Sequence, residues 1–401
     1  MSKKLKKNVP VLRFPDFIEP WLIKSVSELV KENFIYKPLD GNHGNLHPTS
    51  FDYVKSGIPF VMSNNIQNGV IKYSECPYIS EDLARSLQKG FSKEGDVLLT
   101  HKGTVGEVAI VGPTPFPFIM LTPQVTYYRV KNLKLLSNLF LASFFVSSNF
   151  QKMLKVLAAG GTRPYIGITE QGKLNISIPS VKEQEKIASF LGAVDTRLNQ
   201  LRRKLEDLQT YKRGVMQKLF SQQIRFTQPD GSPFPPWEKK KLEDIVDSVS
   251  SGRSKAIKEV GDYPVYGSTG IIGTSEMGDY SGEAILIARV GANAGKISHA
   301  SGVYGVTDNT IIIKVKSPNN VYLFRTQLEI KRLNSMVFGS GQPLITGTQI
   351  KKLEIIFPSL HEEQEKIANF LTTIDCKIET LSRQIDQTEQ FKKGLLQKLF
   401  V

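Results

Sequence analysis

The strongest constraint on the fold is a long segment that occurs twice. Residues 183–220 and 363–400 align without a gap, nearly half of their positions are identical, and both begin Glu-Gln-Glu-Lys-Ile-Ala. Most differences are conservative, such as Val194 in the first copy and Ile374 in the second. The distance between the copies is far longer than the roughly 20–50 residues of a solenoid repeat. The chain therefore contains a duplicated unit, made of a domain and the helix that follows it.

Both copies have apolar residues spaced alternately four and three apart, a period of about 3.5 that indicates a left-handed coiled coil. Two such helices in one chain most simply pack on each other, although each could pack on its own globular neighbour or on a second copy of the chain. Lys212 and Lys392 interrupt both patterns at the same position, which suggests that helices of a partner complete the seam. The predicted seam residues are Ile187, Leu191, Val194, Leu198, Leu201, Leu205, Ile367, Leu371, Ile374, Ile378, Leu381 and Ile385.

The segments before the helices are rich in Gly, Pro and β-branched residues, as in β-rich domains with long loops. Short strand-like runs cover 96–100, 107–111, 124–130, 284–288 and 310–315, and helix-like runs cover 135–157 and 321–336. Both segments therefore have α+β character. The predicted order is an N-terminal tail (1–20), a first domain (21–180), a helix (181–220), a linker (221–236), a second domain (237–358) and a second helix (359–401).

The net charge of +14 favours a polyanionic partner, either nucleic acid or an acidic membrane surface. A generally basic protein without such a partner remains the alternative. Cys76 and Cys376 lie in non-equivalent parts of the two units, so we expect no disulfide and a reducing cytosol. No run of 18 apolar residues occurs, so we expect no membrane span.

Two motifs that could suggest other chemistry do not fit it. The run 291–296 resembles a phosphate loop, but it has three residues between its glycines and lacks the Ser or Thr that follows the lysine. His43 and His47 have the spacing of a helical zinc pair, but the surrounding Gly and Pro disfavour a helix, and a polar recognition loop fits better. We find no recognisable nucleophile–histidine arrangement, methyltransferase, helicase or nuclease motif, and we interpret the chain as a non-catalytic binding protein.

Several glycine-rich loops carry cationic, amide and hydroxyl side chains suited to DNA. Arg and Lys read guanine and Asn and Gln read adenine, whereas Lys, Ser and Thr often hold phosphates. Arg163 and Gln342 stand at matched points of the two units. The candidate DNA-binding residues are Asn64, Asn65, His101, Lys102, Thr104, Thr162, Arg163, Arg253, Ser254, Lys255, Ser268, Arg289, Lys296 and Gln342.

The chain resembles the specificity subunit of type I restriction–modification systems over nearly its whole length. The resemblance depends on the two Pro-Ser pairs that each precede a Glu-Gln-Glu-Lys-Ile-Ala helix, and on two divergent domains before them. Family-like segments at 57–60, 263–268 and 287–295 support it. The region of Asn64 and Asn65 matches the second domain less well, as expected where two domains read different sequences.

The resemblance implies two mixed α/β target-recognition domains separated by two long antiparallel helices, in a pseudo-twofold repeat. Each domain would read one half of a bipartite double-stranded DNA site, and the helices would set the spacer and bind two methylation subunits. Those subunits would use S-adenosylmethionine, and restriction subunits would use ATP and magnesium, in the cytoplasm of a bacterium or archaeon. This chain would bind no cofactor or metal and catalyse nothing. A coiled-coil adaptor that joins two protein ligands, or an enzyme with an unrecognised site in the first domain, remains the alternative.

Overall fold

The computed structural model describes residues 8–159, 164–255, 260–336 and 343–401. The chain forms two compact units, which are described separately. The first consists of residues 1–203 and 383–401, and the second of residues 204–382. None of the helices in the described part of the chain combines the length and apolar character that a membrane span requires.

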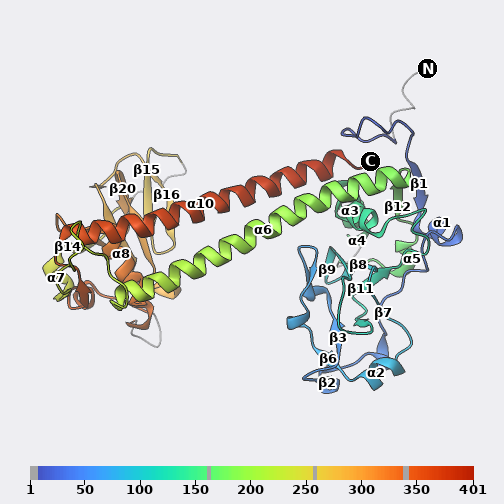
Figure 1. The fold of residues 1–401 in the computed structure, drawn as a ribbon, viewed down its shortest axis with the longest axis horizontal. Coiled ribbons are helices and arrows are strands. Elements are labelled where there is room, and N and C mark those ends of the chain that lie inside the picture. The colour runs from blue at the N-terminus through green and yellow to red at the C-terminus, as the bar shows by residue number, and fades with distance from the viewer. Residues whose placement is uncertain (1–7, 160–163, 256–259, 337–342) are drawn as a thin grey trace. The chain divides into compact units, whose positions relative to one another are not determined.

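Two long helices, α6 (Val181–Phe220) and α10 (His361–Lys398), contribute a segment to each unit (Figure 1). In the first unit, Asp195 and Arg202 of α6 form ion pairs with Lys392 and Glu389 of α10, at 2.5 and 2.6 Å. The partners on α10 come in reverse chain order, so the two segments run antiparallel. The prediction of two long antiparallel helices is therefore confirmed.

The predicted seam residues are all buried or half-buried. The two lysines that interrupt the seam have partners within the chain. Lys212 bonds to Asp375 at 2.5 Å in the second unit, and Lys392 bonds to Asp195 in the first. These pairs are repeat-equivalent. Each ammonium group therefore has a carboxylate on the facing helix, and the involvement of a partner helix at the seam stays a prediction.

The first unit contains a mixed five-stranded sheet (β2-β6-β3-β10-β7), an antiparallel three-stranded sheet (β11-β8-β9) and two strand pairs, β1-β12 and β4-β5. Helices α3 and α4 cover the three-stranded sheet. The elements are β1 (Leu22–Ser25), α1 (Val26–Lys31), β2 (Tyr53–Val54), β3 (Ile58–Val61), β4 (Ile66–Gln67), β5 (Val70–Ile71), β6 (Tyr78–Ile79), α2 (Glu81–Ser86), β7 (Phe91–Ser92), β8 (Val97–Lys102), β9 (Thr104–Ile110), β10 (Ile119–Leu121), β11 (Val125–Tyr128), α3 (Asn138–Val146), α4 (Ser148–Ala158), α5 (Ile168–Gln171) and β12 (Asn175–Ile178).

The second unit repeats this plan with an antiparallel sheet (β14-β21-β18-β19), a mixed sheet (β16-β15-β20-β17) and the pair β13-β22. The elements are β13 (Glu238–Lys241), α7 (Leu242–Ile245), β14 (Val246–Ser251), β15 (Tyr263–Gly267), β16 (Gly270–Ser275), β17 (Tyr280–Ser281), β18 (Ala284–Ala288), β19 (Ile297–Ala300), β20 (Val303–Val306), β21 (Thr310–Val315), α8 (Val321–Ile330), α9 (Gly347–Lys351) and β22 (Glu354–Phe357). The predicted α+β class is therefore confirmed in both units. The helix-like run 135–157 forms two helices, because the Ser147 hydroxyl caps the start of α4.

The repeated Glu-Gln pair at the start of each long helix holds the domain before it. Glu183 is 1% exposed and accepts hydrogen bonds from Arg13 at 2.8 Å and from the Trp21 indole at 3.2 Å. Glu363, also 1% exposed, accepts from Arg225 at 2.8 Å. A heptad pattern assigns such carboxylates to the solvent face. Here they are buried because each binds the arginine of the segment that leads into its domain.

The glutamine beside each carboxylate bonds to the start of the helix that packs on the sheet. The Gln184 amide oxygen accepts from the Ser137 backbone N–H at 2.8 Å, and its amide nitrogen donates to the carbonyl of Pro179. Gln364 makes the equivalent bond with Asn320, at 2.9 Å. These backbone groups would otherwise lack a partner, so the repeated motif is a conserved structural clamp within the chain.

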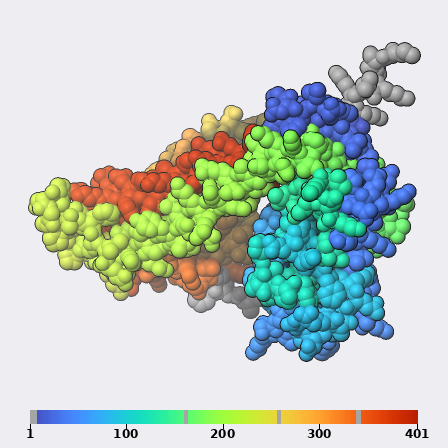
Figure 2. Space-filling model, turned by 45° about the vertical axis from the view of Figure 1, so that its right-hand side comes forward, coloured from blue at the N-terminus to red at the C-terminus, as the bar shows by residue number. Residues whose placement is uncertain are grey.

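The N-terminal strap, residues 8–20, lies in the first unit where the linker that follows α6 (residues 221–236) lies in the second. Its Leu12 N–H donates to the Lys398 carbonyl at the end of α10, at 2.9 Å. In the second unit, Ile224 of the covalent linker bonds to the equivalent Lys218 carbonyl. Figure 2 shows the strap (dark blue) against the start of α6 (green) and the end of α10 (red). The same backbone bond therefore forms at the end of α10 in the first unit and at the end of α6 in the second. The segment that makes it is the N-terminal strap in the first unit and the linker that continues α6 in the second.

Candidate nucleic-acid interface

Four loops meet at one end of the sheets in the first unit. They are residues 41–43, 61–64, 101–102 and 122–124. Backbone hydrogen bonds join them: Gly41 N–H donates to the Thr122 carbonyl, Thr122 N–H to Val61, and His101 N–H to Gln124, at 3.3, 3.0 and 2.9 Å. Residues 61–64 begin at the end of β3, 101–102 end β8 and 122–124 follow β10, so the topology gathers side chains that are distant in sequence.

The second unit builds the same arrangement from residues 252–255, 266–268, 289–290 and 306–309. Thr307 N–H donates to the Tyr266 carbonyl and Arg289 N–H to Asn309, both at 2.9 Å. Ser254 N–H donates to Val306 at 2.8 Å. The repeat thus extends to loops whose sequences have little in common.

The backbone bonds show which side chains stand at equivalent places. The backbone N–H groups of His101 and Arg289 each donate to the loop that follows the mixed sheet. Their backbone carbonyls accept from the N–H groups of Ile166 and Ile345, respectively. Gly41 and Gly252 both lie so close to the backbone of the neighbouring strand that a Cβ would approach it to 1.9 and 2.3 Å. Each glycine is needed for this close approach. The framework is shared, whereas the side chains that it presents differ.

In the second domain three of these segments, 252–255, 266–268 and 306–309, line a groove of about 550 Å³. It brings together four of the predicted residues: Arg253 and Lys255 are exposed, Ser268 is half-buried, and Ser254 is buried. The Ser254 hydroxyl donates to Asp279 and accepts from the Val306 N–H, so it stabilises the loop. The other lining residues are Gly252, Gly267, Ile272, Thr307, Asp308 and Asn309. Cations at the rim and amide and hydroxyl groups within suit a nucleic-acid strand.

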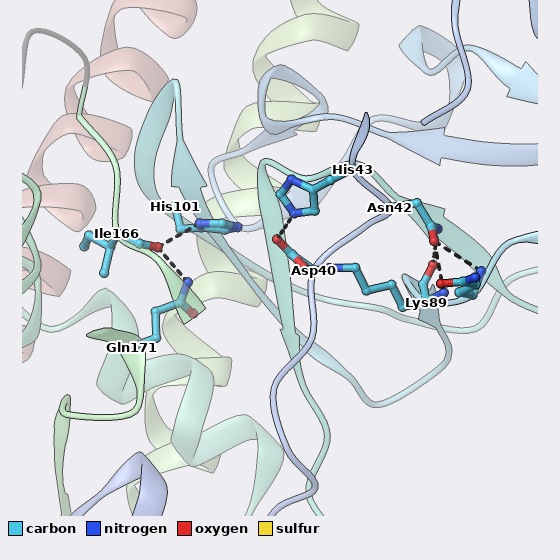
Figure 3. A network of polar contacts seen from close by, with 8 residues as sticks. Asp40, Asn42, His43, Lys89, His101, Ile166 and Gln171 are labelled. Carbon is cyan, nitrogen blue, oxygen red and sulfur yellow. Dashed lines mark hydrogen bonds and ion pairs between the residues drawn. The ribbon is translucent and has the colours of Figure 1, made fainter. Parts of the chain in front are cut away.

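In the first domain a polar network supports the same loops (Figure 3). Asp40 is buried, and its carboxylate accepts from His43 Nε2 at 2.7 Å and from the Lys89 ammonium. Burial would raise the pKa of Asp40, but the hydrogen bonds from Lys89 and His43 outweigh it and hold this pKa below its usual range. The buried Asn42 amide donates to the Lys89 carbonyl at 2.6 Å, which ties this loop to the loop before β7.

The structure separates the remaining predicted residues into exposed and buried groups. Asn64, Lys102, Thr104 and Lys296 are exposed, and Arg289 is half-buried. Asn65 and His101 are buried. Thr162, Arg163 and Gln342 lie outside the described residues.

Both buried residues make hydrogen bonds inside the protein. The Asn65 amide accepts from the Met62 N–H at 2.9 Å and donates to the Glu75 carbonyl at 3.1 Å, so it closes its own loop. His101 Nδ1 donates to the Ile166 carbonyl at 2.9 Å. Burial lowers the pKa of His101, against the opposite effect of this hydrogen bond.

The two motifs set aside in the sequence have structural explanations. His43 bonds to Asp40, whereas the His47 ring packs on Phe60, so the two histidines serve different contacts. No group of three metal-binding side chains occurs within the described ranges. In the 291–296 run, Gly295 has a φ of +88°, and a Cβ there would lie 2.5 Å from the Asn334 backbone nitrogen. The close approach at this glycine is therefore made to the chain's own backbone.

The candidate DNA-binding residues did not include several residues that the structure places in these loops, namely Asn42, Ser63, Gln124 and Asn309, and His43 was assigned only to a polar recognition loop. Ser63 and Gln124 are bonded to each other, at 3.1 Å between Oγ and Oε1. The available signal was the polar run 41–48, which the sequence marks as a recognition loop. Its relation to residues 122–124 depends on sheet pairing that one sequence does not reveal.

Comparison with known proteins agrees with this architecture. The family model of the type I restriction modification DNA specificity domain matches residues 41–209 and 235–390. The type I restriction enzyme MjaVIII specificity subunit of Methanocaldococcus jannaschii is 24% identical, with 86% of this chain and 89% of that protein covered. The EcoKI specificity subunit of Escherichia coli is 22% identical, covering 87% and 82%. The crystal structure of a type I S subunit from M. genitalium superposes with a TM-score of 0.64 at 17% identity, covering 98% of this chain and 99% of that one.

The chain belongs to the family of type I restriction–modification DNA specificity subunits, and it contains two DNA specificity domains. The resemblance found in the sequence is therefore confirmed.

Proposed function

We propose that each domain reads one half of a bipartite DNA site with its four-loop edge. The observation that carries this proposal is the repetition of that edge in both units with different side chains. Direct contacts are assigned to the exposed or half-buried residues, and Asn65, His101 and Ser254 support the loops. The proposed contact residues are Asn64, Lys102, Thr104, Arg253, Lys255, Ser268, Arg289 and Lys296.

The chain itself acts without catalysis in this proposal. Two methylation subunits bind the helical frame and use S-adenosylmethionine, and restriction subunits use ATP and magnesium, in the cytoplasm. Support for a partner present in two copies comes from Tyr211 and Phe391, which are repeat-equivalent and 53% and 55% exposed on their helices. Large aromatic side chains in such positions commonly anchor protein partners.

The decisive experiment maps methylated adenines in DNA from cells that carry this chain with its methylation subunits. The expected result is two short specific sequences separated by a fixed nonspecific gap. Exchange of residues 21–180 for the first domain of a relative should change one half-site only. A change in the other half-site would refute the assignment of one domain to one half-site.

A second test concerns the helices as the determinant of the gap. Because α6 and α10 pair, seven residues are inserted after Leu201 and seven after the equivalent Leu381, which keeps the apolar stripe in phase. Seven residues extend a helix by about 10.5 Å, or about three base pairs of B-DNA. The gap should lengthen by that amount while both half-sites persist. Insertion of seven Gly-Ser linker residues after Ile224 is the control, and it should leave the gap unchanged.

DNA binding is separated from a protein-adaptor role by its salt dependence. Release of counterions makes the affinity for DNA fall steeply as salt concentration rises. A DNA affinity that is independent of salt, or absent in the assembled complex, would favour the adaptor.

A further inference from the structure

His43 stands on the most exposed of the four loops in the first domain. His43 is half-exposed, and the 3₁₀ turn η1 (Gly44–Leu46) that follows is exposed throughout. Gly44 has a φ of +60°, and a Cβ there would meet no atom within 4 Å, so this turn projects into solvent. At the base, Asn42 fixes the loop through its bonds to residues 88–89. His43 is therefore an exposed side chain on an anchored loop, as a base-reading residue requires.

Asp40 determines which nitrogen of His43 carries a proton. An ionised carboxylate only accepts hydrogen bonds, so the 2.7 Å contact requires a hydrogen on Nε2. The pKa of Asp40 is held below its usual range, so the carboxylate is ionised at neutral pH. Its other oxygen is bound by Lys89, whose positive charge compensates it. In the neutral form of this imidazole, Nδ1 is then an acceptor, on the side of the ring away from Asp40 (Figure 3).

We propose that His43 is a specificity-determining residue of the first domain, with Nδ1 accepting a hydrogen bond from the amino group of adenine or cytosine in the major groove. These two bases are the ones that present a donor there, at N6 and N4. A phosphate offers acceptors alone, so this tautomer does not suit the DNA backbone. Lys102 is exposed, and its positive charge contributes to lowering the pKa of His47 and His101 in the same cluster. Its ammonium group is suited to a neighbouring phosphate. The inference rests on the proposed function, because it assigns one contact within the half-site.

The substitution Asp40→Asn gives a sharp test, because it reverses the tautomer. Lys89 requires an acceptor, so the amide oxygen faces its ammonium group and the amide nitrogen faces His43. Nε2 must then accept, which moves the hydrogen to Nδ1 and makes that atom a donor. A donor pairs with the major-groove acceptors, which are O6 and N7 of guanine, O4 of thymine and N7 of adenine, and it no longer suits the amino groups. The variant should therefore exchange the preference at one base pair instead of merely weakening binding.

The experiment uses the full chain assembled with its methylation subunits. Methylation rates are measured on duplexes in which each base pair of the mapped site is replaced in turn by the other three. The chains compared are wild type, His43→Leu, Asp40→Asn and the control His361→Gln. His361 is a similarly exposed histidine that pairs with Glu365 at the start of α10. Thermal unfolding of each variant shows whether it is folded.

Wild type should discriminate for adenine or cytosine at one position of the first half-site. His43→Leu should reduce that discrimination by about 10- to 100-fold at this position alone, and Asp40→Asn should shift it toward a base with a major-groove acceptor, namely guanine, thymine or adenine through N7, and away from cytosine. The control should keep the wild-type pattern. If His43→Leu keeps the pattern, or weakens all positions of both half-sites equally, the inference is wrong, whether or not Asp40→Asn folds. A wild-type chain that yields no bipartite site would instead refute the proposed function.

Discussion

Replacing Glu183 by alanine should strongly destabilise the first unit. The carboxylate is 1% exposed and binds an arginine, Arg13, that is 11% exposed, so the substitution leaves a nearly buried guanidinium group without a counter-ion. It also removes the acceptor of the Trp21 indole N–H. Loss of one partner from a buried ion pair costs about 3–5 kcal/mol. For a unit of about 200 residues, each kcal/mol lowers Tm by about 2–4 °C, which gives a decrease of roughly 6–20 °C.

The matched control is Glu363→Ala in the second unit. Its Arg225 partner is 24% exposed, so water solvates the released guanidinium group better than it solvates Arg13. Calorimetry gives the transition temperatures, and hydrogen exchange of peptides from each domain assigns the transitions to a unit. We expect Glu183→Ala to lower the Tm of its unit more than Glu363→Ala lowers that of the other. A smaller effect of Glu183→Ala would refute the view that burial determines the strength of this clamp.

Three further predictions concern single side chains. Asn65→Ala should destabilise the first unit by about 1–3 kcal/mol, because it leaves buried backbone groups without partners, and methylation mapping should show an unchanged first half-site. Burial lowers the pKa of His101, so below about pH 6.5 the unfolded chain binds a proton that the folded chain does not. The stability of the first unit should therefore be constant above that pH and fall as pH decreases, with a weaker dependence in His101→Phe; equal pH profiles would contradict the assignment. A double-mutant cycle on Lys212 and Asp375, with 20% and 33% exposed side chains, should give a coupling of about 0.2–1 kcal/mol that salt reduces. A coupling that is independent of salt would count against an ion pair.

The sequence predicted the parts of the fold that depend on local periodicity. The long helices and strands such as β18 and β21 follow from spacing and β-branched composition, since each pattern lies within one element. The break at Ser147 within the helix-like run 135–157 was missed, because a cap depends on one hydroxyl rather than on a period. The burial of Glu183 was missed for a similar reason: its partner Arg13 is distant in sequence.

The candidate site was only partly predictable, because a polar residue beside a glycine can either face a ligand or satisfy backbone groups of its own loop. Arg253 and Lys255 are exposed and line the groove, as the composition of their loop suggested. Asn65 occurs in an equally polar run, but its amide satisfies two backbone groups of its own loop. Side-chain chemistry is the same in both cases, and burial distinguishes them. Burial in these loops follows from long-range strand pairing, which the sequence pattern does not specify.

The distribution of shared and divergent residues explains how such a chain can change its target without losing its fold. The groups that satisfy buried backbone atoms, such as Gln184 and Gln364, are identical in the two units. At the loop edges, the bonds that join the loops are between backbone atoms, which every residue other than proline provides whatever its side chain. His43 and Ser254 can therefore occupy matched loops. His43 is held by Asp40, three residues before it, whereas Ser254 is held by Asp279 from another loop. Substitution of an exposed side chain on these loops, such as His43 or Arg253, alters the groups presented to DNA while the backbone bonds that hold the edge together remain. Changes in specificity should therefore concentrate at these loop positions, whereas changes in stability should concentrate at the clamps.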